Sequence, residues 1–145
     1  MPAVDILNSF YHFYDNSNSN LRANKVKAAI DELALQSTHL SVSSTSNNVS
    51  IDINQARSFS HTLNENTTLN ILNPPLTGQS VEITLKLQQD SLGSLFTFSW
   101  PASFEWPGGI VPTLTTDPLA IDVFKFYTHT AGGTWYAYEV GKDFK

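Results

Sequence analysis

The segment QSVEITLKLQ, residues 79–88, decides the fold class, because polar and apolar side chains alternate without interruption from Ser80 to Gln88. Val81, Ile83, Leu85 and Leu87 fall on one side of an extended chain, and the residues between them fall on the other. A period of two over this length predicts a β-strand with one face in a core and the other face turned away from it.

The same alternation recurs from residue 39 onward, with turn-forming residues such as Asn64-Glu65-Asn66 between the segments. We expect about eight short strands at intervals of roughly 8–12 residues, and a long connection over 101–118. The expected strands are 39–43, 48–53, 57–63, 66–72, 79–88, 95–100, 120–129 and 134–140. The pattern predicts a mainly β protein, an antiparallel β-sandwich or jelly roll, preceded by an N-terminal arm and one short α-helix.

The single helical pattern covers residues 24–34, where Val26, Ile30 and Leu33 recur at i, i+4 and i+7. A helix of about three turns is not stable alone in water, so this narrow apolar stripe must pack on something. Two partners fit. Other copies of the same helix would make these three residues a trimer interface, and the alternative is the domain's own sheet.

Aromatic residues gather at the N-terminus, where Phe10, Tyr11, Phe13 and Tyr14 precede the polar run DNSNSN at 15–20. Short polar side chains compete for backbone hydrogen bonds and favour a linker. We expect the four aromatic residues to dock on another protein; the alternative is that they add to their own core. The predicted organisation is a docking arm and linker in 1–20, a short helix in 21–37 and a β-sandwich domain in 38–145.

Only 14% of the 145 residues are charged, against about 25% in an average soluble protein. Such a charge-poor surface favours close packing between subunits over the life of a free enzyme. The net charge of −5 argues against a nucleic-acid partner, and the absence of cysteine excludes disulfides and cysteine-ligated metals. Neither a signal-peptide pattern nor an apolar run of roughly 18 residues is present, so we expect no secretion signal and no membrane insertion.

Residues suited to catalysis occur without the patterns that catalysis needs. His12, His39, His61 and His129 accompany many serines, but no G-x-S-x-G motif does. The acidic residues form no metal-binding spacing, and no glycine loop precedes a helix to hold a phosphate. We therefore expect no catalytic residues, no metal and no cofactor.

Three tryptophans, Trp100, Trp106 and Trp135, could stack on a sugar or supply core area. Large aromatic side chains mainly build the core in small β-domains, so we favour a core or interface role. Trp106, within Trp106-Pro107-Gly108-Gly109, is expected to pin the long connection to the sandwich. It is also the residue that we would test for a glycan contact.

A further set of features has a specific order. The strands of 59–72 lead into Asn73-Pro74-Pro75, and Gly78 precedes the amphipathic strand 81–87. After these come Trp100-Pro101, Trp106-Pro107-Gly108-Gly109, Pro112-Thr113-Leu114-Thr115, and the terminal segments 121–127, 134–136 and 141–144. In this order, residues 48–145 resemble the β-sandwich modules of bacteriophage virion proteins, which occur in tail-fibre, baseplate and head-decoration polypeptides. The helix at 26–33 is similar to the short helix that often precedes fibre modules.

This resemblance implies a homotrimeric structural protein on the surface of a virion, made in the host cytoplasm and carrying no catalytic residues. Its expected partners are further copies of itself and the major capsid protein or another virion protein. The chain has no repeat shaft and no large distal domain, which favours a capsid decoration protein or a short head fibre. The alternative is a tail-fibre or baseplate component that binds a host-surface glycan; a free carbohydrate-binding module ranks third, and an enzyme last.

Deleting residues 2–14 separates the two roles open to the aromatic arm. Ordering such a peptide costs roughly 1–2 kcal/mol per residue in backbone entropy, which four aromatic side chains buried on a partner can offset. If the arm docks on a virion protein, the shortened chain keeps its melting temperature but no longer co-sediments with particles. A large fall in Tm would contradict docking and assign the segment to the core.

Overall fold

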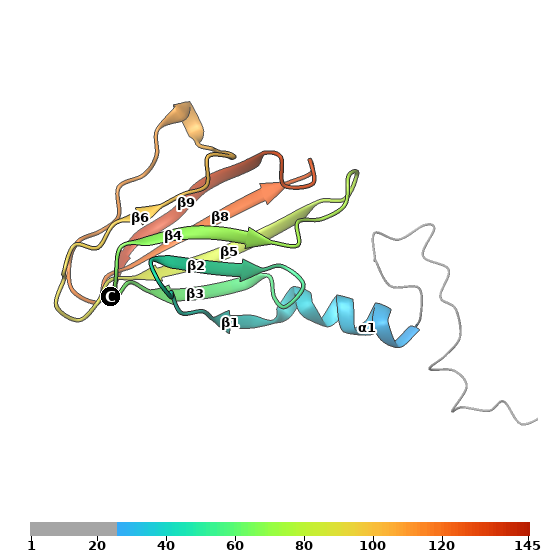
Figure 1. The fold of residues 1–145 in the computed structure, drawn as a ribbon, viewed down its shortest axis with the longest axis horizontal. Helices are drawn as coiled ribbons and strands as arrows, with labels where there is room; N and C mark the ends of the chain where they lie inside the picture. The colour runs from blue at the N-terminus through green and yellow to red at the C-terminus, as the bar shows by residue number, and fades with distance from the viewer. Residues whose placement is uncertain (1–25) are drawn as a thin grey trace, which may run out of the picture.

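The computed structural model describes residues 26–145, which form a mainly β structure with one short helix and nine strands in two sheets (Figure 1). The helical elements are α1 (Val26–Ala34) and the single 3₁₀ turns η2 (Leu35–Ser37) and η3 (Pro107–Gly109). The strands are β1 (His39–Ser41), β2 (Asn48–Asp52), β3 (Ser58–Thr62), β4 (Thr67–Leu72), β5 (Val81–Gln88), β6 (Phe98–Ser99), β7 (Phe104–Glu105), β8 (Ile121–Thr128) and β9 (Trp135–Phe144).

The first six strands alternate between the two sheets. The larger sheet has the order β1-β3-β5-β8-β9-β7, and the smaller sheet has the order β2-β4-β6. In Figure 1 the smaller sheet lies in front of the larger one, with β2 over β3 and β4 over β5 and β8. The chain changes sheet after each of these strands. After one full circuit through both sheets, it forms a strand next to the one from which the circuit began. Leu40 then pairs with Phe59, and Val49 pairs with Leu69.

The expectation of an antiparallel sheet is wrong for most of the pairings. In residues 26–145, five strand pairs are parallel, and two, β5 with β8 and β8 with β9, are antiparallel. For the four parallel pairs among β1 to β6 the reason is the circuit: a strand reached after a full turn through the other sheet runs in the same direction as its neighbour. Asn64-Glu65-Asn66 accordingly connects β3 of one sheet to β4 of the other, and is not the turn of a hairpin.

The core lies between the two sheets and has members from both. The inward positions predicted on β5 are confirmed, because Val81, Ile83, Leu85 and Leu87 are at most 7% exposed. The buried apolar cluster also takes Val49, Ile51 and Leu69 from the smaller sheet and Phe59, Phe124, Phe126, Trp135 and Ala137 from the larger one. Burying a side chain of this kind contributes about 1.5–3 kcal/mol, so the shared core is the main force that holds the sheets together.

The long connection between β6 and β8 is fixed to this core by aromatic rings. The ring of Trp106 is 8% exposed and lies 5.0 Å from that of Trp100 and 6.1 Å from that of Phe124, centroid to centroid. Of the core or interface role predicted for Trp106, the structure shows the core position. A buried carboxylate, Asp122, holds the far end of the connection by accepting hydrogen bonds from the backbone N–H and the hydroxyl of Thr115.

Two glycines provide a test of how tightly the turn before β9 is packed. Gly132 has φ +80°, and a Cβ placed on it would lie 2.7 Å from the Cβ of Pro74. Gly78 has a similar φ of +86°, but an added Cβ would meet nothing within 4 Å. Both alanine substitutions carry the strain of a positive φ, about 1 kcal/mol, and only Gly132→Ala adds a collision.

We expect Gly132→Ala to lower the free energy of unfolding by about 1–3 kcal/mol more than Gly78→Ala does. Denaturant unfolding of the two variants side by side measures the difference. Equal losses would show that the turn moves away from Pro74 without cost.

Candidate functional site

The three described histidines lie in different environments: His61 on β3 is buried, whereas His39 on β1 and His129 after β8 are exposed. His39 on β1 has both ring nitrogens engaged, with Nδ1 2.8 Å from the Ser58 hydroxyl and Nε2 3.1 Å from the Ser60 hydroxyl. A serine nucleophile needs a histidine whose second nitrogen is oriented by a further group, usually a carboxylate. In His39 that second nitrogen is taken by a serine. The contact is therefore a polar cluster on the sheet surface and not a nucleophile–base–acid arrangement.

Residues 26–145 contain neither a cluster of potential metal ligands nor a membrane-spanning helix. No group of three His, Cys, Asp or Glu side chains in this part of the chain could hold a metal ion. No helix in the same residues is long and apolar enough to cross a membrane.

The apolar stripe of α1 faces outward. Val26, Ile30 and Leu33, the residues predicted to form a trimer interface, are 39%, 60% and 52% exposed. They recur at helical spacing, so they share one face. In Figure 1, α1 extends from the end of β1 beyond the two sheets. The alternative partner, the domain's own sheet, does not bury this stripe, because more than half of the surface of Ile30 and of Leu33 stays exposed.

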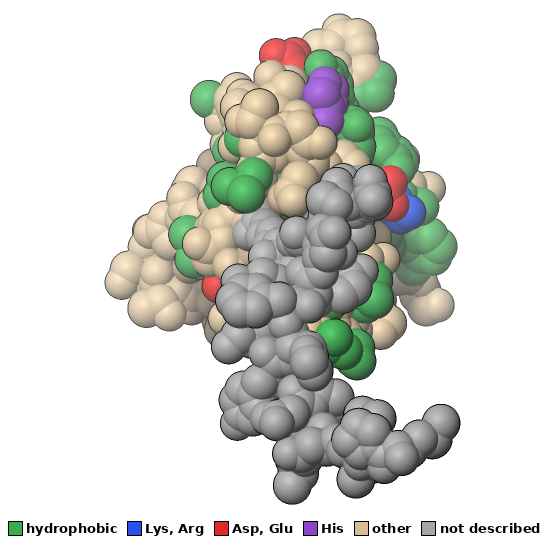
Figure 2. Space-filling model, turned by 90° about the vertical axis from the view of Figure 1, so that its right-hand side faces the viewer, with side chains coloured by type: hydrophobic (Ala, Val, Ile, Leu, Met, Phe, Trp, Pro, Cys, Tyr) green, Lys and Arg blue, Asp and Glu red, His purple; other side chains and the backbone are tan. Residues whose placement is uncertain are grey.

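A second exposed surface is the outer face of the larger sheet, where β8 and β9 carry aromatic side chains. Tyr127 lies directly across from Tyr136, and their rings are 6.4 Å apart. The His129 ring stacks on Tyr136 at 5.9 Å with an interplanar angle of 8°. Figure 2 shows hydrophobic side chains along the right-hand margin of that view, with a histidine and an adjacent acidic and basic pair among them.

Next to these rings lies a charged group of three residues. Lys125 Nζ donates to Glu82 Oε1 at 2.7 Å, and the Tyr138 hydroxyl donates to Glu82 Oε2 at 3.2 Å. The hydrogen bond from Lys125 lowers the pKa of Glu82, and the same hydrogen bond raises the pKa of Lys125. Burial, followed by the nearby Glu82 charge, raises the pKa of Tyr138. The group is thus charged and internally paired at neutral pH, and it borders the aromatic surface without adding net charge.

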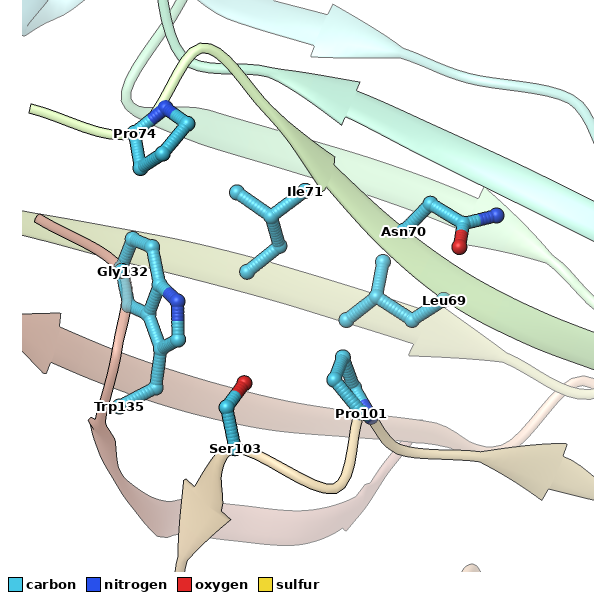
Figure 3. A pocket seen from close by; sticks show the side chains of 8 residues that line it. All are labelled: Leu69, Asn70, Ile71, Pro74, Pro101, Ser103, Gly132 and Trp135. Atoms are coloured by element: carbon cyan, nitrogen blue, oxygen red, sulfur yellow. The ribbon is translucent and has the colours of Figure 1, made fainter.

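A hollow of about 150 Å³ opens between β4 and the turn before β9 (Figure 3). Leu69 and Ile71 of β4 point across it toward Trp135 and Pro101, and Ser103 lies on the same side as these two. None of the eight residues that line the hollow is titratable. It therefore contains no side chain for acid–base chemistry.

The remaining predicted site residues have different outcomes. The arm residues Phe10, Tyr11, Phe13 and Tyr14 lie outside the described residues, and their docking role stays a prediction. Trp106, suggested for a glycan contact, is buried among other rings, so little of its surface is available to stack on a sugar.

The aromatic surface of β8 and β9 was not predicted as a site. Alternation within the last two strands places Tyr127 on an outward face, and places Tyr136 and Tyr138 together on another. The signal that was missing is the pairing of β8 with β9, which puts Tyr127 and Tyr136 opposite each other.

No protein-family model matches the chain, and comparisons with curated proteins and with solved structures gave no match.

Removing the lysine of the charged group tests its electrostatics. Without Lys125 the Glu82 carboxylate loses its main stabilising partner, so Lys125→Met raises the pKa of Glu82 toward its ordinary value of 4.5. Because the folded pKa is lowered, the pair stabilises the fold at neutral pH, and this contribution is lost as the pH falls through that lowered pKa. The effect on stability is small, since both side chains are more than one-third exposed.

NMR of the side-chain carboxyl carbon over an acid titration follows Glu82 directly. Lys86→Met is the matched control, because Lys86 is on the same face of β5 but four residues away. A Glu82 titration that is unchanged in Lys125→Met would contradict the pairing.

Proposed function

We propose that this chain is a non-enzymatic structural protein of a bacteriophage virion, acting as a homotrimer on the particle surface. Within that class, a capsid decoration protein or a short head fibre is the form that we favour. The observation that carries the proposal is the exposed apolar stripe of α1, formed by Val26, Ile30 and Leu33. A short amphipathic helix with its apolar side uncovered needs a partner to be stable in water.

Copies of the same helix are the partner that fits this stripe best. A spacing of i, i+4 and i+7 gives the narrow seam of a coiled coil, which is buried completely only when two or three such helices pack side by side. The nine residues of α1 span roughly 14 Å, so the helical seam alone is short. The sheet domains next to it must supply the rest of the interface area.

The surface chemistry supports close packing between copies. Only 14% of the residues are charged, and the ion pairs of residues 26–145 are exposed pairs that add little to stability. A charge-poor, serine- and threonine-rich surface can approach a copy of itself with less repulsion between like charges than an ordinary charged surface. The sequence resemblance of residues 48–145 to phage β-sandwich modules adds the virion context.

A second candidate function is a tail-fibre or baseplate component that binds a host-surface glycan. The observation that favours it is an aromatic-lined pocket beside β6, at a distance from α1. Cryo-electron microscopy of intact particles distinguishes the capsid location from the tail location. A chain that is absent from purified particles would contradict both.

A charge placed in the helical seam tests the trimer. We expect Ile30→Asp to convert a trimer to monomers, because an unpaired carboxylate in an apolar seam costs several kcal/mol. Ala28→Asp is the matched control: it adds the same charge to the same helix at an exposed position outside the stripe. Multi-angle light scattering measures the mass of each. A stable monomer of the unchanged chain at micromolar concentration would overturn the proposal, as would dissociation by Ala28→Asp alone.

A further inference from the structure

One histidine lies in the core between the two sheets. His61 of β3 is 1% exposed, and its Nδ1 lies 3.0 Å from the carbonyl oxygen of Val42. A carbonyl oxygen can only accept a hydrogen bond, so Nδ1 carries the hydrogen. A neutral histidine ring has one such hydrogen, and its other nitrogen, Nε2, is then a bare acceptor. The contact with Val42 therefore fixes both the orientation and the tautomer of the ring.

The second ring nitrogen is buried without a partner. Nε2 of His61 has almost no accessible surface, and none of the described residues forms a hydrogen bond with it. Its surroundings are apolar: His61 pairs with Leu87 on β5, and the Phe98 ring of β6 lies 6.4 Å away, centroid to centroid. A bare acceptor here costs about one hydrogen bond, and a protonated Nε2 would add an unpaired charge to that cost. The core is therefore suited to the neutral ring and not to the protonated one.

The buried carboxylate nearest to this ring along the sheet is already engaged. The register of inward positions runs from His61 through Leu87 to Asp122 of β8, two strand spacings or about 10 Å between backbones. The Asp122 carboxylate accepts hydrogen bonds from the N–H and the hydroxyl of Thr115 and from the N–H of Asp143. It is thus held away from Nε2 and does not pair with it.

The other elements packed against the ring direct their titratable side chains elsewhere. On β1 and β5, the neighbours of β3, alternation places His39, Glu82 and Lys86 on the outer face of the sheet. In the smaller sheet β4 and β6 contain no titratable residue, and Asp52 lies at the end of β2 on its outer face. Arg57, four residues before His61, donates to backbone carbonyl groups of the preceding turn.

The strand whose side chain faces the ring is weakly held. β6 is an edge of the smaller sheet and pairs with β4 over only two residues. Next to this short ladder, the backbone N–H of Thr67 donates to the carbonyl oxygen of Thr97 at 2.8 Å. In contrast, β3 pairs with β5 over five residues. Movement of β6 is therefore the easiest way to bring water to Nε2.

We propose that His61 is an acid-sensitive latch: protonation of its Nε2 by solvent releases β6 from the core, while the larger sheet stays folded. Water can hydrate the added N–H in the open form, whereas the closed form leaves it unpaired. The open form therefore binds one more proton, so opening becomes more favourable as the pH falls below the ordinary histidine pKa of about 6.5. Above that pH neither form takes up the proton, and the latch stays closed.

Hydrogen exchange of the Thr67 amide in the full chain measures the latch, because its bond to Thr97 breaks when β6 leaves. From about pH 7.5 to about pH 5.5 we expect its opening constant, corrected for intrinsic exchange, to rise about tenfold, the limit for one proton per opening. Amides of β5 and β8 should show no comparable rise. An equal rise in all strands, or none at Thr67, would overturn the proposal.

Two variants separate His61 from the other titrating groups. His61→Asn keeps an N–H for Val42 and cannot take up a proton, so the rise at Thr67 should disappear. His129→Asn is the matched control, because it removes an exposed histidine after β8 and should leave the rise unchanged. A rise that persists in His61→Asn, or is lost in His129→Asn, contradicts the latch.

NMR of the ring nitrogens in the unchanged chain tests the premise even if His61→Asn does not fold. At about pH 7.5, above the ordinary histidine range, we expect a single tautomer of His61 with its hydrogen on Nδ1. A mixture of tautomers, or a ring that becomes protonated while the Thr67 amide stays protected, would show that the core accepts both forms and would overturn the proposal.

Discussion

The ring contacts of Trp100 are the interaction on which the position of the long connection between β6 and β8 depends. Its ring lies 4.8 Å from Phe98 of the smaller sheet and 4.9 Å from Phe124 of the larger one. The strands on either side, β6 and β7, each pair over only two residues, so backbone hydrogen bonds alone cannot hold this part of the chain. Aromatic pairs add about 0.5–1.5 kcal/mol each beyond the area they bury. The position of the long connection, and with it the pocket beside β6, follows from this cluster.

The alternation of the chain between sheets has a second consequence, which concerns the sheet edges. Each later strand of β1 to β6 pairs with the strand that precedes it in the same sheet. In residues 26–145, β1 and β2 are therefore the edge strands of the two sheets on the side where α1 enters. Edge strands offer unpaired backbone groups to other chains. Here β1 has only three residues, which limits pairing with unrelated strands. If copies of α1 pack together as proposed, these edges are brought near the same interface.

The sequence was sufficient to predict which residues of β5 are buried, but not how the strands pair. Alternation identified Val81, Ile83, Leu85 and Leu87 as inward-facing, because side-chain burial follows directly from a period of two. It could not identify direction, because parallel and antiparallel strands share that period. Asn64-Glu65-Asn66 has the composition of a hairpin turn and yet connects two sheets. The pocket was missed for a similar reason: Gln89 and Val111 are far apart in sequence, and only the fold brings them together.

The α1 stripe and the pocket beside β6, on which the two candidate functions rest, lie at opposite ends of the strands. This separation would allow one trimer to use both surfaces. In Figure 1, α1 is at the right of the sheets, whereas the loop between β5 and β6, which contributes to the pocket, is at the left. A trimer joined near α1 would leave its three pockets open at the other end. If the pocket holds the glycan of the second candidate function, each site binds weakly, and three linked sites raise the effective concentration for a multivalent surface. Individual affinities in the millimolar range would then suffice for attachment to a glycan-covered surface, with no deeper pocket required.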